Sequence, residues 1–107
     1  MATIPSIQYK QGTLTVGTNS LLSAPNGYRA EVSLRFNNPA AYDITLTIIR
    51  KSPASTLDVY SITLDAGDTV DDTGYSLDPY DSIQVSTTTP GTNYFLTINN
   101  IPYYPTA

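Results

Sequence analysis

Six aspartates fall within one turn-rich region, and their types and spacing are the first feature that invites chemistry. They are Asp65, Asp68, Asp71, Asp72, Asp78 and Asp81. Calcium binds several carboxylate and carbonyl oxygens in a flexible loop. No glutamate closes a loop of EF-hand length here, and aspartate commonly opens β-turns. We interpret the aspartates as turn caps and expect no metal or other cofactor. The candidate calcium ligands to test are Asp65, Asp68, Asp71 and Asp72.

Catalysis has few other residues to use. The chain contains no histidine and no cysteine, which excludes an imidazole base, a Ser-His or Cys-His pair and a zinc site with His or Cys ligands. Glycoside hydrolysis needs two carboxyl groups facing each other across a cleft. Any two of the aspartates fit that description, so the pattern is not specific. We expect no enzyme activity and name no catalytic residue.

Nine tyrosines offer aromatic surface, which stacks on sugars or on single-stranded bases. Nucleic acid is excluded by a net charge of −4 and only five scattered basic residues. We expect Tyr28, Tyr60 and Tyr94 to place their rings in the core and their hydroxyls at its rim. Tyr103 and Tyr104 instead lie in a proline-bounded tail without a core of its own. A neighbouring subunit is the expected cover for those two rings.

The overall composition favours contact with other proteins. Charged residues make up only 13% of the chain, whereas threonine and tyrosine are plentiful. Protein interfaces are enriched in tyrosine and depleted of lysine and glutamate. The N-terminal residues have no basic segment followed by an apolar run, and no apolar stretch has the length of a membrane span. We therefore expect no signal peptide and no membrane partner.

The elements that must position these side chains are strands. In Tyr28–Phe36 every second residue is apolar, and Ile44, Leu46 and Ile48 continue the same alternation after the break at Asn37-Asn38-Pro39. A period of two is that of a strand with one buried face. Shorter strands are predicted at 13–16, 57–64, 83–87 and 94–98. Turns are predicted at Lys10–Gly12, at 17–19 and at Asp71–Gly74.

A short internal repeat links two of the predicted turns. Leu64–Val70 matches Leu77–Ile83, with an apolar strand end, two aspartates, a hydroxyl residue and a β-branched residue at equal spacing. Aspartate side chains cap turn amides, and Gly67 and Pro79 favour turn dihedrals.

No segment shows helical periodicity. Seven to eight short strands predict an all-β, two-sheet antiparallel β-sandwich, with jelly-roll and immunoglobulin-like connectivity both open. At 107 residues the chain is one domain, 1–107, with extended N-terminal (1–9) and C-terminal (101–107) segments.

Four motifs occur in an order that resembles small structural proteins of tailed bacteriophage virions. They are Leu21–Val32, which contains Pro25-Asn26-Gly27, then Phe36–Pro39, Leu64–Asp68 and Asp81–Val85. The resemblance covers residues 13–100. It implies a β-sandwich that decorates or cements the head, or that serves in the neck or tail, and it implies no catalytic residues.

We therefore expect a virion protein, assembled in the host cytoplasm, that stabilises the capsid as a decoration or cement protein. The expected partners are the major capsid protein or other virion subunits, together with further copies of this chain. The expected contact residues, all in the terminal segments, are Ile4, Ile7, Tyr9, Ile101, Tyr103 and Tyr104. A neck or tail subunit and a carbohydrate-binding module that uses exposed tyrosines and loop carboxylates are the alternatives.

Overall fold

A computed structural model describes residues 4–103, which form eight strands and no helix. In chain order the strands are β1 (Ile7–Thr13), β2 (Gly17–Ser23), β3 (Tyr28–Asn37), β4 (Ile44–Lys51), β5 (Thr56–Leu64), β6 (Thr69–Leu77), β7 (Ser82–Thr87) and β8 (Asn93–Pro102). All the pairings between them are antiparallel.

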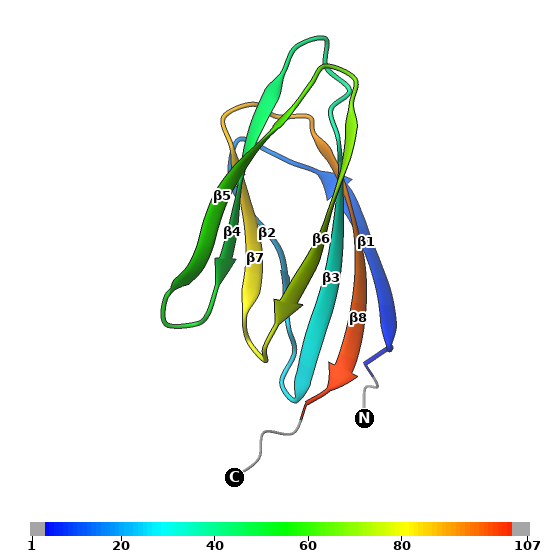
Figure 1. Ribbon diagram of the computed structural model, residues 1–107, viewed down its shortest axis with the longest axis vertical. Coiled ribbons are helices and arrows are strands. Elements are labelled where there is room, and N and C mark those ends of the chain that lie inside the picture. Colours follow the sequence, from blue (N-terminus) through cyan, green and yellow to red (C-terminus); the bar gives the residue numbers. More distant parts are fainter. Residues whose placement is uncertain (1–3, 104–107) are drawn as a thin grey trace.

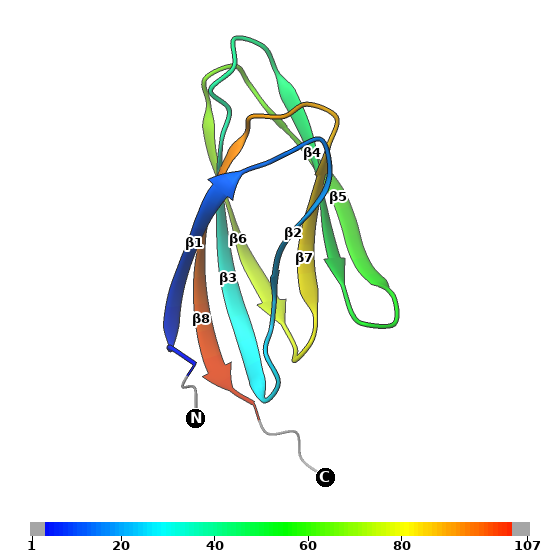
Figure 2. The same cartoon turned by 180° about the vertical axis from the view of Figure 1, so that it is seen from behind.

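The strands make two four-stranded sheets that face each other (Figures 1 and 2). Sheet A has the order β1-β8-β3-β6, and sheet B has the order β2-β7-β4-β5. The prediction of a two-sheet antiparallel sandwich is confirmed. Of the strands that follow one another in the chain, β4 and β5 alone pair, and every other connection crosses between the sheets. An immunoglobulin fold pairs its first two strands in one sheet, so this eight-stranded order is a jelly roll.

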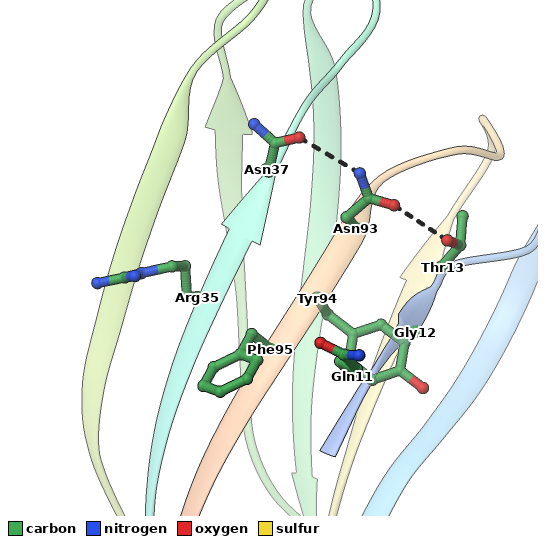
Figure 3. A pocket seen from close by; sticks show the side chains of 8 residues that line it. All are labelled: Gln11, Gly12, Thr13, Arg35, Asn37, Asn93, Tyr94 and Phe95. Carbon is green, nitrogen blue, oxygen red and sulfur yellow. Dashed lines mark hydrogen bonds between the residues drawn. The ribbon is translucent and has the colours of Figure 1, made fainter. Parts of the chain in front are cut away.

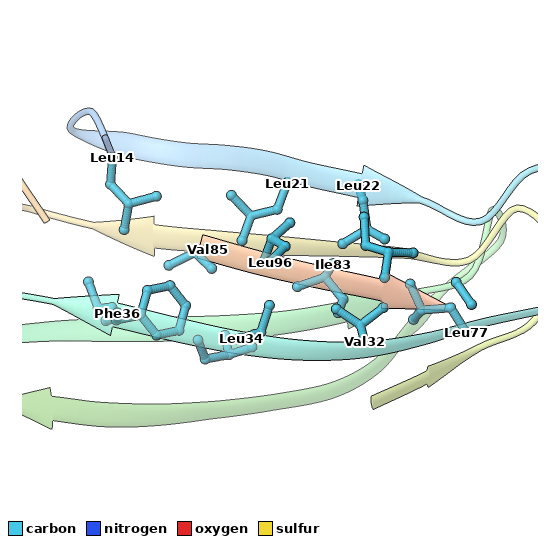
Figure 4. Close-up of a cluster of buried hydrophobic side chains, with 14 of the residues drawn as sticks. Leu14, Leu21, Leu22, Val32, Leu34, Phe36, Leu77, Ile83, Val85 and Leu96 are labelled. Carbon is cyan, nitrogen blue, oxygen red and sulfur yellow. The ribbon is translucent and has the colours of Figure 1, made fainter. Parts of the chain in front are cut away.

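The alternation predicted for Tyr28–Arg50 is what builds the core. Ala30, Val32, Leu34 and Phe36 of β3 are buried, and Ile44, Leu46 and Ile48 of β4 are buried opposite them. Leu96 of β8 and Ile83 of β7 complete the layer between the sheets (Figure 4). Full burial of one such side chain stabilises the fold by about 1.5–3 kcal/mol. The rings of Tyr60 and Tyr94 pack against this core, as predicted. Tyr28, predicted with them, is half-buried and is not among the side chains packed on the core.

The predicted positions of the turns and strands near the N-terminus were wrong. Lys10–Gly12 is not a turn, because it lies inside β1, which pairs with β8 along its whole length. The predicted strand at 13–16 is instead the connection after Thr13, and the predicted turn at 17–19 begins β2. The chain needs this connection because it changes sheet there, so Leu14 is buried without belonging to a strand.

The predicted turn at Asp71–Gly74 was also wrong, because it lies within β6. Two aspartates before a glycine look like a turn in sequence. Here Gly74 is the extra residue of a β-bulge against Val32 and Ser33, and its φ of 94° suits glycine. The bulge lies on an edge strand, where exposed polar residues are common.

The two repeated turns have the same geometry. The amide of Asp68 donates to the carbonyl of Asp65 at 3.0 Å, and that of Asp81 donates to Asp78 at 2.9 Å. Equivalent residues within the two turns have positive φ, with 77° at Gly67 and 71° at Tyr80. The repeat therefore records one turn used twice, although Tyr80 lacks the freedom of glycine.

Side chains close the sandwich where edge strands β5 and β6 approach. The hydroxyls of Tyr60 and Tyr75 both donate to Oδ2 of Asp72, the latter at 2.6 Å, and their rings stack at 6.2 Å. Arg50 of β4 donates to the carbonyl of Ser76 at 3.2 Å. These bonds join sheet B to β6, so we call Arg50, Tyr60, Asp72 and Tyr75 the polar seam.

Candidate functional site

The outer face of sheet A carries side-chain amides and charged groups that bond one another across the strands. At one end of this face, one residue from each strand forms a lateral chain of hydrogen bonds. Thr13 Oγ1 donates to Asn93 Oδ1 at 3.0 Å, and Asn93 Nδ2 donates to Asn37 Oδ1 at 3.3 Å. Asn37 Nδ2 then donates to Thr69 Oγ1 at 3.1 Å. We call these four residues the amide row.

The next row of the same face contains Gln11, Phe95, Arg35 and Asp71, again one from each strand. Arg35 Nε donates to Asp71 Oδ1 at 2.6 Å, which directs the guanidinium toward β6. Tyr9 stacks on the exposed Phe95 ring with ring centroids 6.0 Å apart. The stacking restrains one side of the Phe95 ring.

Gly12 keeps the space that Tyr94 occupies beneath these rows. A Cβ atom at Gly12 would lie 2.6 Å from Tyr94 Oη and 2.8 Å from its Cζ. The tyrosine ring therefore occupies the space that the side chain of any other residue type at position 12 would need. A glycine covered by a cross-strand aromatic ring is a recognised way to stabilise such a position.

Together these residues line an open groove of about 480 Å³ between β1, β8 and β3 (Figure 3). We call it the amide groove. Its lining residues are Gln11, Gly12, Thr13, Arg35, Asn37, Asn93, Tyr94 and Phe95. None of them is a carboxylate, and in the adjoining hollow the one carboxylate is Asp71, which is paired with Arg35. The arrangement can stack and hydrogen-bond a ligand.

At the other end of the outer face of sheet A, three large side chains are exposed beside the Arg29–Glu31 ion pair. Tyr9 is 66% exposed, Ile7 47% and Ile101 36%. They come from the edge strand β1 and from its neighbour β8, near the ends of the described chain (Figures 1 and 2). We call these three residues the apolar end.

The other predicted contact residues are placed differently. Ile4 and Tyr103 are half-buried, and the amide of Tyr103 donates to the carbonyl of Gly27 at 2.9 Å. The segment before β1 is tied down by Asn100, whose Nδ2 donates to the carbonyl of Pro5 at 3.0 Å. Tyr104 lies outside the described residues. The predicted terminal segments thus contribute Ile7–Tyr9 to β1 and Ile101–Pro102 to β8.

The candidate calcium ligands are not gathered into one site. Asp71 lies on the outer face of sheet A, whereas Asp72 points inward to the two tyrosines. Asp65 and Asp68 belong to the turn before β6. Within residues 4–103 no three acidic side chains come close enough to hold a metal ion.

The pKa values of the neighbouring residues Asp71 and Asp72 are shifted in opposite directions. The hydrogen bond from Arg35 holds the pKa of Asp71 below its ordinary value. Burial raises the pKa of Asp72 above its ordinary value. Burial also raises the pKa of Tyr75 to about 12, with a further contribution from the charge of Asp58.

Sequence reasoning missed the amide row. Asn37 and Asn93 looked like residues that end or precede strands, and Phe95 was an outward position in a short strand. Their meeting depends on β8 lying between β1 and β3, which neighbouring residues in the chain do not encode. The alternation that places Phe95 and Arg35 outward was the one available signal.

Comparison with protein-family models, with curated sequences and with solved structures found no match to this chain. Across the described part of the chain no helix is long and apolar enough to cross a membrane.

Proposed function

We propose that this chain is a structural protein of a tailed-bacteriophage virion, and specifically a decoration protein that stabilises the head. The observation that carries the proposal is the apolar end. Three large apolar side chains exposed on adjacent strands are typical of a protein–protein contact. Covering them with a capsid subunit would remove this apolar surface from water, which is a favourable change.

The position of the apolar end supports a contact by strand pairing. β1 is the edge of sheet A, and its free side can accept an added strand. A stable contact buries on the order of 1,000 Å² in total, about half of it from each partner. That share, about 500 Å², is about a twelfth of the chain's accessible surface of 6175 Å².

The topology supports the proposal by analogy. Eight-stranded jelly rolls occur in viral capsid proteins and also in lectins. A fold alone does not determine function, so the analogy adds to the apolar end and does not replace it. The proposed partners are the major capsid protein and further copies of this chain, and the proposed location is the assembled virion.

Co-sedimentation tests this role. Heads assembled without this protein are mixed with wild type and with an Ile7→Ser, Tyr9→Ser, Ile101→Ser variant, which should fold because all three side chains are exposed. Wild type should sediment with the heads in a saturable ratio, and the variant should not. A matched control, Thr45→Ala with Ser61→Ala on sheet B, should bind as wild type does.

Two outcomes would overturn the proposal. Wild type that stays in the supernatant would remove the head role, and a triple variant that still binds would remove the apolar end as the contact. Purified tails serve as the parallel sample, since binding to tails alone would assign the chain to the neck or tail. Light scattering on the free protein tests self-association, which should give a defined oligomer.

A further inference from the structure

We propose that the amide groove is a binding site for a neutral carbohydrate. Phe95 would stack on a sugar ring, and the amides beside it would bond the hydroxyl groups. The inference goes beyond the proposed structural role and does not depend on it.

The aromatic platform is exposed and already held in place. The Phe95 side chain is 38% exposed, and it is restrained by Tyr9 at 6.0 Å with an angle of 29° between the rings. One face of a pyranose ring presents mainly C–H groups, which an aromatic face attracts through its negative quadrupole. A ring that is fixed before binding loses little conformational entropy when the ligand arrives.

The amide row has hydrogen-bonding capacity left over. Asn93 uses one lone pair of Oδ1 to accept from Thr13 and one proton of Nδ2 to bond Asn37. An amide has two donors and two acceptor sites, so one of each remains for a ligand. Sugar hydroxyls both donate and accept, and they match a pair of this kind. The bonds within the row fix the direction in which the free donor and acceptor point.

Gln11 adds a second exposed amide on the near side of Phe95, on strand β1. The groove that these residues line, about 480 Å³, lies within the range of roughly 300–1,000 Å³ typical of small-molecule sites. Figure 3 shows the Phe95 ring and the amides of Gln11, Asn37 and Asn93 around this space.

Charge favours a neutral sugar over an acidic one. Arg35, the one cation in the lining, is neutralised by Asp71 at 2.6 Å, and the whole chain carries −4. Lys51 lines a different groove beside β2 and β7, and Lys10 lines both that groove and the hollow beside Phe95. The two lysines come together only in the groove beside β2 and β7. An anionic ligand would be attracted there, which provides an internal control for the assignment.

The groove and the apolar end adjoin at one point. Tyr9 of the apolar end stacks on Phe95 of the groove with ring centroids 6.0 Å apart. A capsid subunit that covers Tyr9 would therefore limit access to the Phe95 ring, so the sugar test is made on the free protein.

The test begins with immobilised neutral oligosaccharides that end in glucose, galactose, mannose or N-acetylglucosamine, with sialylated and sulfated versions as the acidic arm. Isotope-labelled wild-type protein is then titrated with the best neutral probe, and its backbone amide signals are followed by NMR. The signals of Gln11, Asn93 and Phe95 should shift, and those of Lys51 and Gln84 should not. This readout requires no variant to fold.

Variants then assign the contacts. Phe95→Leu removes the aromatic face and keeps the bulk, and Asn93→Ala removes the free amide. Each substitution should raise the dissociation constant at least about tenfold, which corresponds to about 1.4 kcal/mol of binding free energy. Gly12→Ala, which displaces the Tyr94 ring, should also weaken binding. Lys51→Ala is the matched control and should bind as wild type does.

Three results would overturn the proposal. One is the absence of neutral-sugar binding up to about 10 mM, where even the weakest useful affinities are detected. Another is binding that neither Phe95→Leu nor Asn93→Ala changes. The third is binding confined to acidic glycans and abolished by Lys51→Ala, which would place the site on sheet B.

Discussion

The two sheets share one core, but their outer faces differ in kind. Sheet A presents the amide row, an exposed aromatic pair and the ion pairs Arg35–Asp71 at 2.6 Å and Arg29–Glu31 at 3.2 Å. Sheet B presents short hydroxyl side chains, such as Thr45 facing Thr63 at 3.2 Å, together with the exposed aliphatic side chains of Leu57 and Val59 on β5. Thr47 and Ser61 form a second such pair at 3.4 Å. Both faces are hydrogen-bonded across their strands, yet only sheet A carries planar groups around an exposed ring.

The difference shows which requirements come from folding and which do not. Hydroxyl pairs across strands suit a pleated, half-buried surface and stabilise it by a few tenths of a kcal/mol. Such hydroxyl pairs satisfy the requirements of folding for an outer face without a ligand or partner. The exposed aromatic rings of sheet A gain little in stability from water contact, so their presence favours a ligand or partner.

Asn37 and Asn38 are neighbours in the chain, but Asn37 lies on the outer face of sheet A and Asn38 lies in the interior. Asn38 is fully buried, and its Nδ2 donates to the carbonyls of Tyr42, Leu64 and Asp65 at 2.8–3.2 Å. Asn38→Ala leaves these buried carbonyls without that donor and should lower the free energy of unfolding by about 3 kcal/mol. Asn37→Ala should cost about 0.5 kcal/mol, because water can replace its bonds. Urea denaturation measures both, and equal losses would contradict the distinction.

The turn repeat compares the two connections that leave β5 and β6. Tyr80→Gly should raise the free energy of unfolding by about 0.5 kcal/mol. Relief of positive φ at about 1–2 kcal/mol exceeds the entropy of about 0.4–1 kcal/mol that glycine adds to the unfolded chain. Gly67→Ala, the equivalent change in reverse, should lower stability by a similar amount. Thermal unfolding of both variants gives the signs, and matching signs would refute a shared turn.

The coupling between cross-strand pairs differs between the faces. A double-mutant cycle on Asn37 and Asn93 should give a coupling of about 0.5 kcal/mol, since each amide orients the other. The same cycle on Thr45 and Thr63 should give about 0.3 kcal/mol or less, because two flexible hydroxyls lose little when separated. A larger coupling on sheet B than on sheet A would break the comparison.

The smallest expected effect is a pH dependence of opposite sign at Asp71 and Asp72. The folded-state pKa of Asp72 is raised above 3.8, so its contribution to stability is present below that pH and is lost as pH rises through the folded pKa. The folded-state pKa of Asp71 is lowered below 3.8, so its contribution is present above that pH and is lost as pH falls.

Asparagine variants reveal these signs. The melting temperature of Asp72→Asn minus that of wild type should be higher at about pH 7 than at about pH 3. The same difference for Asp71→Asn should be lower at about pH 7 than at about pH 3. Differential scanning fluorimetry at the two pH values makes the measurement. Shifts of the same sign for both variants would show that the two carboxylates share one environment.

Much of the fold could be predicted from alternation, but not the strand order. β3 and β4 follow period-two patterns that no other structure explains as well, and they were predicted almost to their ends. β6 was missed because Asp71, Asp72 and Gly74 are turn residues by type, and only an edge strand with a bulge accommodates them. The jelly-roll order depends on long-range packing between strands of similar composition.

The candidate site could be predicted only in part, for the same reason. Ile7, Tyr9 and Ile101 were named from their place in weakly charged terminal segments, and the structure brings them to one end of sheet A. The amide row was not predicted, because Asn37 and Asn93 are 56 residues apart and meet only when β8 lies beside β3. Side-chain type alone does not show which outward residues become neighbours.

Photocrosslinking in the assembled particle tests whether the apolar end contacts the capsid. A photoreactive benzoylphenylalanine replaces Tyr9 on the outer face of sheet A, or Thr47 on the outer face of sheet B as the matched control. Illumination should join the chain to the major capsid protein from position 9 and give no such product from position 47. Crosslinks from position 47 and none from position 9 would show that the contact face has been assigned to the wrong sheet.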